Sequence, residues 1–109
     1  MEIDGTTFEV NYETAPVSVQ GCLQRYLEDH IPGGSFMNAV LSNDLREAFS
    51  TADDFNRYEL FDIVKWLYNE APGSTWGSPE NVKAWLERGR NTPPLDSTTT
   101  IKPLKGIKL

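Results

Sequence analysis

Large apolar residues recur every three or four positions in the string NRYELFDIVKWLY, between Asn56 and Tyr68. The spacing i, i+3, i+4, i+7 places one set on a single stripe of an α-helix. This stripe consists of Leu60, Ile63, Val64 and Leu67, and Phe61 and Tyr68 widen it on one side. Asn56 fits the N-cap position, and Glu59 fits the matching place in a capping box. The pattern predicts a central helix over 56–68 whose apolar stripe is covered by the rest of the chain.

Two helical segments are predicted before the central helix. Thr14 and Pro16 mark the start of the first, which runs to about His30, because Pro is tolerated in a first turn. Its inward positions are Val19, Cys22, Leu23, Tyr26 and Leu27. The run Pro32-Gly33-Gly34 stops it, since Pro cannot continue the hydrogen-bond ladder and Gly turns freely.

Ser35 fits the cap of the next helix, SFMNAVL. After a new turn near Ser42, three further residues are expected to continue the inward side: Leu45, Ala48 and Phe49. The last helix follows the loop after Asn69–Glu70: Ser78 caps it and Pro79 takes its first position. Its inward residues are Val82, Trp85 and Leu86, and Gly89 is expected to end it.

The two ends of the chain differ from this helical middle. Residues 3–12 alternate apolar and polar side chains, which favours a short strand or extended arm. From Asn91 the sequence NTPPLDSTTTIKPLKGIKL predicts either a flexible tail or a strand that pairs with residues 6–12. We therefore expect a mainly α fold, a compact bundle of four to five short helices with a minor β element from the terminal segments. Its parts are an N-terminal arm (1–13), a helical domain (14–90) and a C-terminal tail (91–109).

Charge changes this picture by excluding some partners. The formal net charge is −6, and residues 1–91 carry seven Lys or Arg against fifteen Asp or Glu. Duplex nucleic acid requires a basic face, so direct binding to it is not expected. No apolar run reaches the roughly 20 residues of a membrane span, and MEIDGTTFEV is no secretory signal. Together with the single cysteine, this favours a cytoplasmic protein without a membrane partner.

Candidate catalytic and metal-binding residues are few. The chain has one histidine, His30, and one cysteine, Cys22. Zinc requires four nitrogen or sulfur ligands, and a nucleophile requires an adjacent base. We therefore expect no enzyme activity, no metal site and no cofactor.

Two glycine-containing turns precede predicted helices and are candidate anion sites. The first is Gly33-Gly34-Ser35, and the second includes Gly77-Ser78 after Trp76. Amide groups at a helix N-terminus favour anions, and aromatic rings such as Trp76 and Tyr68 can stack on a base. With Arg57 or Lys65 pointing inward, these turns would hold a small anionic nucleotide. The alternative is ordinary turn-and-cap structure, and no Walker-type motif is present.

The surplus of aromatic residues suggests a protein interface. Three Trp and four Tyr cannot all be buried in so small a body, and aromatic residues left at a surface are typical interface anchors. Trp66 lies off the main apolar stripe and Trp76 lies in a loop, so both are candidates. The alternative is that both tryptophans pack inside the fold. A basic partner would suit the acidic surface.

Four strings follow one another between Gly33 and Gly89: GGSFMNAVLSNDLREAF, ADDFN, LFDIVKWLYNEAP and WGSPENVKAWLERG. Together they resemble a family of small bacteriophage and prophage proteins of uncharacterised function. The resemblance covers about residues 16–90 and implies a phage setting, hence the host cytoplasm. Two hypotheses follow. The first is a non-enzymatic accessory protein that binds and inhibits a host protein, such as a defence component. The second is a sponge for a small nucleotide, and a homo-oligomer is compatible with both.

Overall fold

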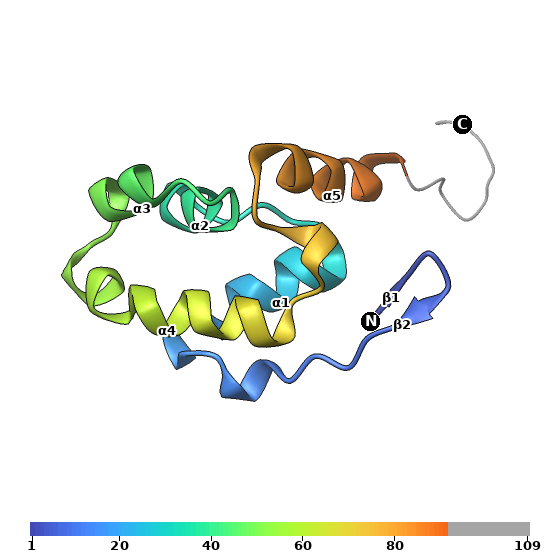
Figure 1. Cartoon of the computed structure of the whole chain (residues 1–109), viewed down its shortest axis with the longest axis horizontal. Helices are drawn as coiled ribbons and strands as arrows, with labels where there is room; N and C mark the ends of the chain where they lie inside the picture. Colours follow the sequence, from blue (N-terminus) through green and yellow to red (C-terminus); the bar gives the residue numbers. More distant parts are fainter. Residues whose placement is uncertain (92–109) are drawn as a thin grey trace, which may run out of the picture.

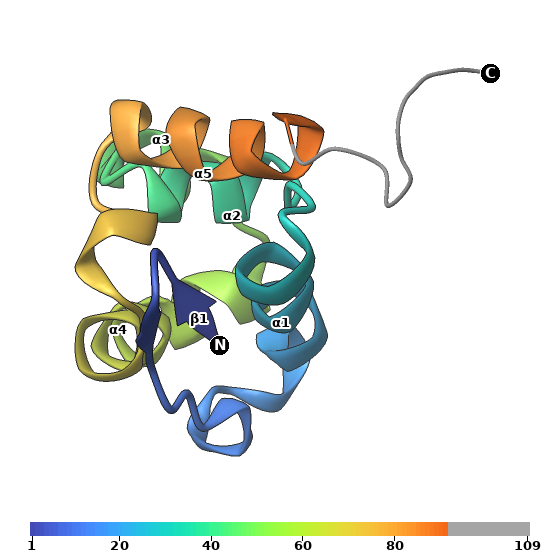
Figure 2. The same ribbon diagram turned by 90° about the vertical axis from the view of Figure 1, so that its right-hand side faces the viewer.

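Five α-helices lie in two layers in the computed structural model, which describes residues 1–91 (Figure 1). One layer holds α1 (Gln20–Asp29) and α4 (Asp54–Glu70); the other holds α2 (Ser35–Leu41), α3 (Leu45–Thr51) and α5 (Pro79–Asn91) (Figure 2). Three 3₁₀ turns complete the helical part: η1 (Tyr12–Thr14), η2 (Val17–Val19) and η3 (Gly73–Thr75). The predicted mainly α bundle with a minor β element is confirmed.

The β element is a hairpin of the N-terminal segment. Strands β1 (Glu2–Ile3) and β2 (Thr6–Thr7) pair antiparallel around Asp4 and Gly5. Both turn residues have positive φ, 51° and 88°, as a two-residue hairpin turn requires. The hairpin lies at one end of the two layers (Figure 2). The predicted pairing of residues 6–12 with the tail involves residues 92–109, which lie outside the described part.

The N-terminal segment contributes to the same core as the helices. Ile3 is buried, and Phe8, Val10 and Tyr12 pack against the core while remaining half-buried. Residues 1–13 are therefore attached to the helical body along their length.

Helix α4 begins two residues earlier than predicted. Asp53 is its N-cap, and the Asp53 carboxylate accepts a 2.7 Å hydrogen bond from the Asn56 amide. The prediction that Asn56 caps the helix is wrong, because an Asp upstream is an equally good cap and adds a negative charge at the helix N-terminus. Glu59 forms no capping box. Its carboxylate accepts a 2.6 Å hydrogen bond from the Ser18 hydroxyl.

The buried side of α4 is rotated relative to the predicted stripe. Ile63 and Leu67 are fully buried as expected, but Trp66 joins them while Phe61 and Tyr68 face outward. Trp66 faces inward because residues of the N-terminal segment cover it. The indole N–H of Trp66 donates to the Asn11 carbonyl and the Thr14 hydroxyl, each at 3.0 Å. The stripe predicted from sequence is wrong on that side.

Helix α3 is also turned differently from the prediction. Only Ala48 is buried in α3, whereas Leu45 and Phe49 are exposed. The small Ala48 side chain allows α3 to pack closely on α2, and on a helix of two turns this leaves the two larger side chains outside.

Helices α1 and α5 are joined through buried polar contacts. The Trp85 indole donates to the Tyr26 carbonyl at 2.8 Å.

Helix α1 begins at Gln20, later than predicted, because Val17–Val19 form the 3₁₀ turn η2. It ends at Asp29, and its C-cap residue His30 is in the left-handed region with φ 58°.

Helix α5 continues past Gly89 to Asn91, so the prediction that Gly89 ends it is wrong. Gly89 serves close packing instead, since a Cβ there would lie 2.7 Å from the His30 Cβ.

Candidate functional site

The outer side of α4 carries large rings exposed to solvent. Tyr58, Phe61 and Tyr68 are 88%, 77% and 81% exposed. Together with Lys65 they occur at intervals of three, four and three residues, which brings all four onto one stripe of a helix with 3.6 residues per turn. We call these four residues the aromatic face. Large exposed rings that share one stripe of a helix mark interaction sites more often than scattered single residues do.

This face exists because α4 carries large apolar side chains on its outer side as well as on its inner side. Ile63, Trp66 and Leu67 fill the inner side, and Val64 at the border is 37% exposed. Within residues 1–91 only the inner side is enclosed.

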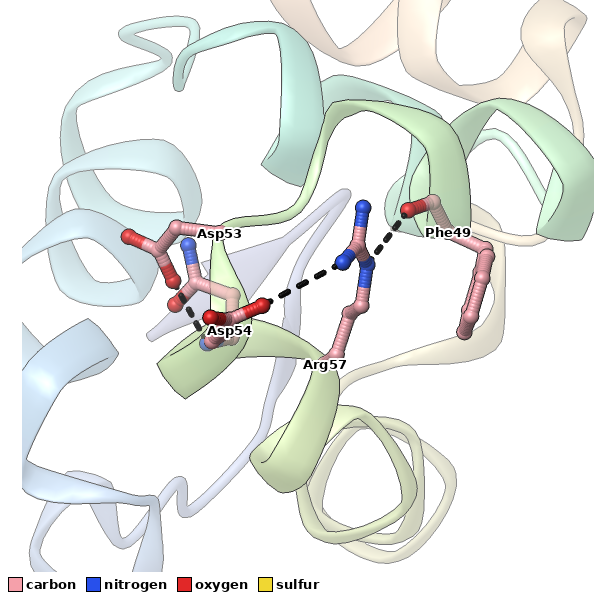
Figure 3. Close-up of polar contacts among 5 residues, drawn as sticks. Phe49, Asp53, Asp54 and Arg57 are labelled. Carbon is pink, nitrogen blue, oxygen red and sulfur yellow. Dashed lines mark hydrogen bonds and ion pairs between the residues drawn. The ribbon is translucent and has the colours of Figure 1, made fainter.

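Helix α3 extends the apolar surface beyond the aromatic face. Leu45 is 69% exposed and Phe49 58%. Figure 3 shows the contacts that Arg57, in the first turns of α4, makes with Phe49 of α3 and with Asp54. Its Nε donates to the Phe49 carbonyl at 3.2 Å, and its guanidinium carbon lies 4.9 Å from the centre of the Phe49 ring. Its Nη1 also forms a 3.3 Å ion pair with Asp54. Arg57 therefore places the Phe49 ring beside the start of the aromatic face.

The segment of α3 and α4 that carries the face is acidic. Between Asp44 and Glu70, seven carboxylates stand against three basic side chains, a net charge of −4. Arg57 is paired with Asp54, whereas Lys65 makes no ion pair within the described residues. The aromatic face is thus a row of rings interrupted by one cation without a carboxylate partner in residues 1–91.

The predicted turn Gly33-Gly34-Ser35 is accounted for by packing and capping. A Cβ on Gly33 would lie 2.8 Å from the Met37 Cβ and 3.0 Å from the Cys22 sulfur. The missing side chain thus lets the turn approach α1 and α2. The N-cap of α2 is Gly34, so the prediction that Ser35 caps this helix is wrong.

Ser35 lines a hollow of about 360 Å³ on α2 and α3, together with Asp44 and Glu47. The two carboxylates disfavour an anion in this hollow.

The turn at Trp76, Gly77 and Ser78 starts α5. The Ser78 hydroxyl accepts a 3.1 Å hydrogen bond from the Asn81 amide, which makes it the cap that the sequence predicts. Gly77 has φ +102° and donates from its amide to the Leu41 carbonyl at 2.7 Å. Trp76 is half-buried, packs against the core, and accepts a side-chain bond from Asn81 on its carbonyl. The Gly77 amide is therefore occupied within the fold.

The remaining predicted binding residues fall in different places. Trp66 is 4% exposed and is not a surface anchor. Tyr68 is exposed and belongs to the aromatic face. Arg57 lies at the α3 edge of that face and not beside Trp76. Tyr58 and Phe61 were not identified as surface residues from the sequence. The signal that could have found them is the second stripe of 3-4-3 spacing on the opposite side of the helix.

His30 and Cys22 lie about 12 Å apart along α1, by the helix rise. The His30 ring packs on Trp85, with ring centres 4.3 Å apart, and its Nδ1 is 2.8 Å from the Trp85 carbonyl. Burial raises the pKa of the Cys22 thiol, and nearby Arg25 partly opposes this effect. Among residues 1–91, no three His, Cys, Asp or Glu side chains gather as a metal site.

Comparison of the chain with protein-family models, with curated proteins and with solved structures gives no match. In the part of the chain that the structure describes, no helix has both the length and the apolar character needed to cross a membrane.

Proposed function

We propose that this protein acts without catalysis, by holding another protein against its aromatic face and thereby modulating it. The observation that carries the proposal is the exposure of Tyr58, Phe61 and Tyr68 on one stripe of α4. Aromatic side chains are enriched in the buried centres of protein interfaces and supply much of their binding energy.

The size of the surface supports this function. A large ring buries about 150–250 Å² when it is fully covered. Three such rings with Phe49 and Val64 therefore approach the roughly 800 Å² per partner of a standard interface. The net charge of −4 of residues 44–70 favours a partner whose rim is basic, because complementary charge speeds association and excludes acidic competitors.

The setting we propose is a phage accessory protein in the host cytoplasm that inhibits a host protein, such as a defence component. The support for this setting is the resemblance of the strings between Gly33 and Gly89 to small phage and prophage proteins. The exposed rings of α4 are consistent with such a setting.

The nucleotide hypothesis receives less support. It requires basic side chains beside Trp76, yet Arg57 is turned to Phe49 and Asp54 at the far end of α4. Lys65 lines a hollow beside Thr14 and Trp66. Lys83 lines a separate one on α5. Three dispersed cations do not form an anion site.

The proposal can be tested by affinity capture from host lysate with the full chain as bait. We expect a stoichiometric partner that is lost with Phe61→Ala and with Tyr68→Ala. Phe55→Ala is the matched control, since Phe55 is 58% exposed on the same helix but lies outside the stripe. Capture of the same partner by all variants, or of none by the unmodified chain, would contradict the proposal. Circular dichroism of each variant checks that the fold is retained.

A further inference from the structure

We infer that the aromatic face is self-complementary and that a second copy of this chain docks on it, with the two α4 helices antiparallel. This inference rests on the proposed function, because it takes the same face as a docking surface and names one occupant. The dimer is reversible and competes with any other partner for the face.

The residues of the aromatic face are spaced symmetrically along α4. The intervals between Tyr58, Phe61, Lys65 and Tyr68 are three, four and three residues, and they read the same from either end. A two-fold axis across the middle of the stripe therefore superposes each position on another of the same stripe, as a closed two-fold interface requires. In that arrangement Tyr58 lies in the layer of Tyr68 from the second copy, and Phe61 lies in the layer of Lys65. Spacings of three and four residues are those with which two helices interlock their side chains.

The charge of Lys65 also favours an antiparallel pair. Lys65 has no ion-pair partner within residues 1–91; it shares the stripe of the exposed rings and borders a hollow that Asp62 also lines. In the antiparallel pair it lies over Phe61 of the second copy, where a cation is attracted to the ring face. It also comes near the Asp62 carboxylate of that copy. Symmetry repeats both contacts, so a lysine that interrupts the apolar row in one chain finds its partner in the other.

Arg57 and Phe49 border the aromatic face and add to the contact area. Arg57 lies on the side of the stripe where Tyr68 of the second copy arrives, and it holds the exposed Phe49 ring there. Tyr68 is thus received by a surface built from two helices. Six rings from the two copies remove on the order of 1,000 Å² from water. With Phe49 and Val64 from each chain the total reaches the lower end of the 1,200–2,000 Å² of stable interfaces. A weak, concentration-dependent dimer is the expected result.

Sedimentation velocity of the full chain, from low micromolar to near-millimolar concentration, tests the inference. We expect a monomer–dimer equilibrium whose dissociation constant rises about tenfold or more in Phe61→Ala, as for other central interface residues. Phe55→Ala, outside the stripe, should leave it unchanged. A chain that stays monomeric throughout, or a dimer indifferent to Phe61→Ala, overturns the inference.

The antiparallel register has its own test. Lys65→Asp alone should weaken the dimer, because it places carboxylates against Asp62 of the other copy. The double exchange of Asp62→Lys with Lys65→Asp should restore it, since opposite charges again meet across the axis. Restoration supports the register, and equal dissociation constants for all three chains overturn it. If no dimer forms while Phe61→Ala still abolishes capture of a host protein, the inference fails and the proposed function stands.

Discussion

The hydroxyl of Tyr26 in α1 donates a 2.7 Å hydrogen bond to the backbone carbonyl of Thr75, in the turn that precedes α5. Tyr26 is 1% exposed and Thr75 is fully buried. This hydrogen bond joins two residues that are 49 positions apart in the sequence, and it connects η3 to α1. The Thr75 hydroxyl bonds to the Pro72 carbonyl at 2.6 Å, so the turn is held from both sides.

Tyr26→Phe removes this bond and leaves the shape of the core unchanged. We expect the free energy of unfolding to fall by about 1–3 kcal/mol, because a buried carbonyl loses its donor. Urea denaturation followed by fluorescence measures the loss. Tyr12→Phe is the matched control, since its hydroxyl bonds to the exposed carboxylate of Glu28, and an equal loss in both variants would contradict the argument.

Gly89→Ala should destabilise the protein although Ala is the better helix former. In an open helix position the exchange gains about 1 kcal/mol. At Gly89 the new Cβ would lie 2.7 Å from the His30 Cβ, so α5 must shift away from α1.

Gly21→Ala in α1 gives the comparison for that variant. The nearest contact of a Cβ there is the mobile end of Arg25, at 3.0 Å. We expect a higher melting temperature for Gly21→Ala and a lower one for Gly89→Ala. A rise in both would show that the contact with His30 is not tight.

The two sides of α4 should respond differently to truncation. Phe61→Ala is expected to change the free energy of unfolding of the monomer by no more than about 0.5 kcal/mol, because the ring is exposed. Ile63→Ala should cost about 2–5 kcal/mol, because it opens a cavity at a fully buried position. Denaturation at low protein concentration, where self-association is negligible, provides the measurement, and similar losses in both variants would contradict the orientation of the helix.

Asp4 in the hairpin turn and Arg88 in α5 form a bidentate contact, with distances of 3.2 and 3.0 Å. Hydrogen bonding from Arg88, and then its charge, lower the pKa of the Asp4 carboxyl below the ordinary 3.8. A carboxyl with a lowered pKa in the folded state stabilises the fold at pH above 3.8. That contribution is lost as the pH falls through the lower folded value.

Titration of the Asp4 carboxyl by NMR tests this contact. Arg88→Gln should bring the Asp4 pKa back up toward 3.8. Lys83→Gln, on the same helix, should leave it unchanged. A pKa that does not respond to Arg88→Gln would show that the contact does not persist in solution.

Local signals in the sequence were reliable where they act within a few residues. Helix α2 ends at Leu41 as predicted, although its cap is Gly34 and not Ser35, and Ser78 and Pro79 open α5 as expected. Caps and prolines work through the hydrogen bonds and backbone angles of their own turn, so no distant partner is needed to interpret them.

Signals that depend on distant partners were less informative. Glycine commonly follows the last residue of a helix, but the missing side chain of Gly89 makes room for His30, which is 59 residues earlier in the chain. This role could not be inferred from the residues next to Gly89. One local choice also failed, because Asp53 and Asn56 are both good caps and the structure uses the first.

The sequence by itself determined a small, acidic, mainly α protein and the approximate extent of its helices, because periodicity and capping are local properties. Only the tertiary structure decided which side of α4 faces inward. That helix carries large apolar side chains on two sides, so its own pattern allows more than one orientation. The N-terminal segment settles the matter by covering Trp66 and bonding to its indole, and this leaves Tyr58, Phe61 and Tyr68 outside.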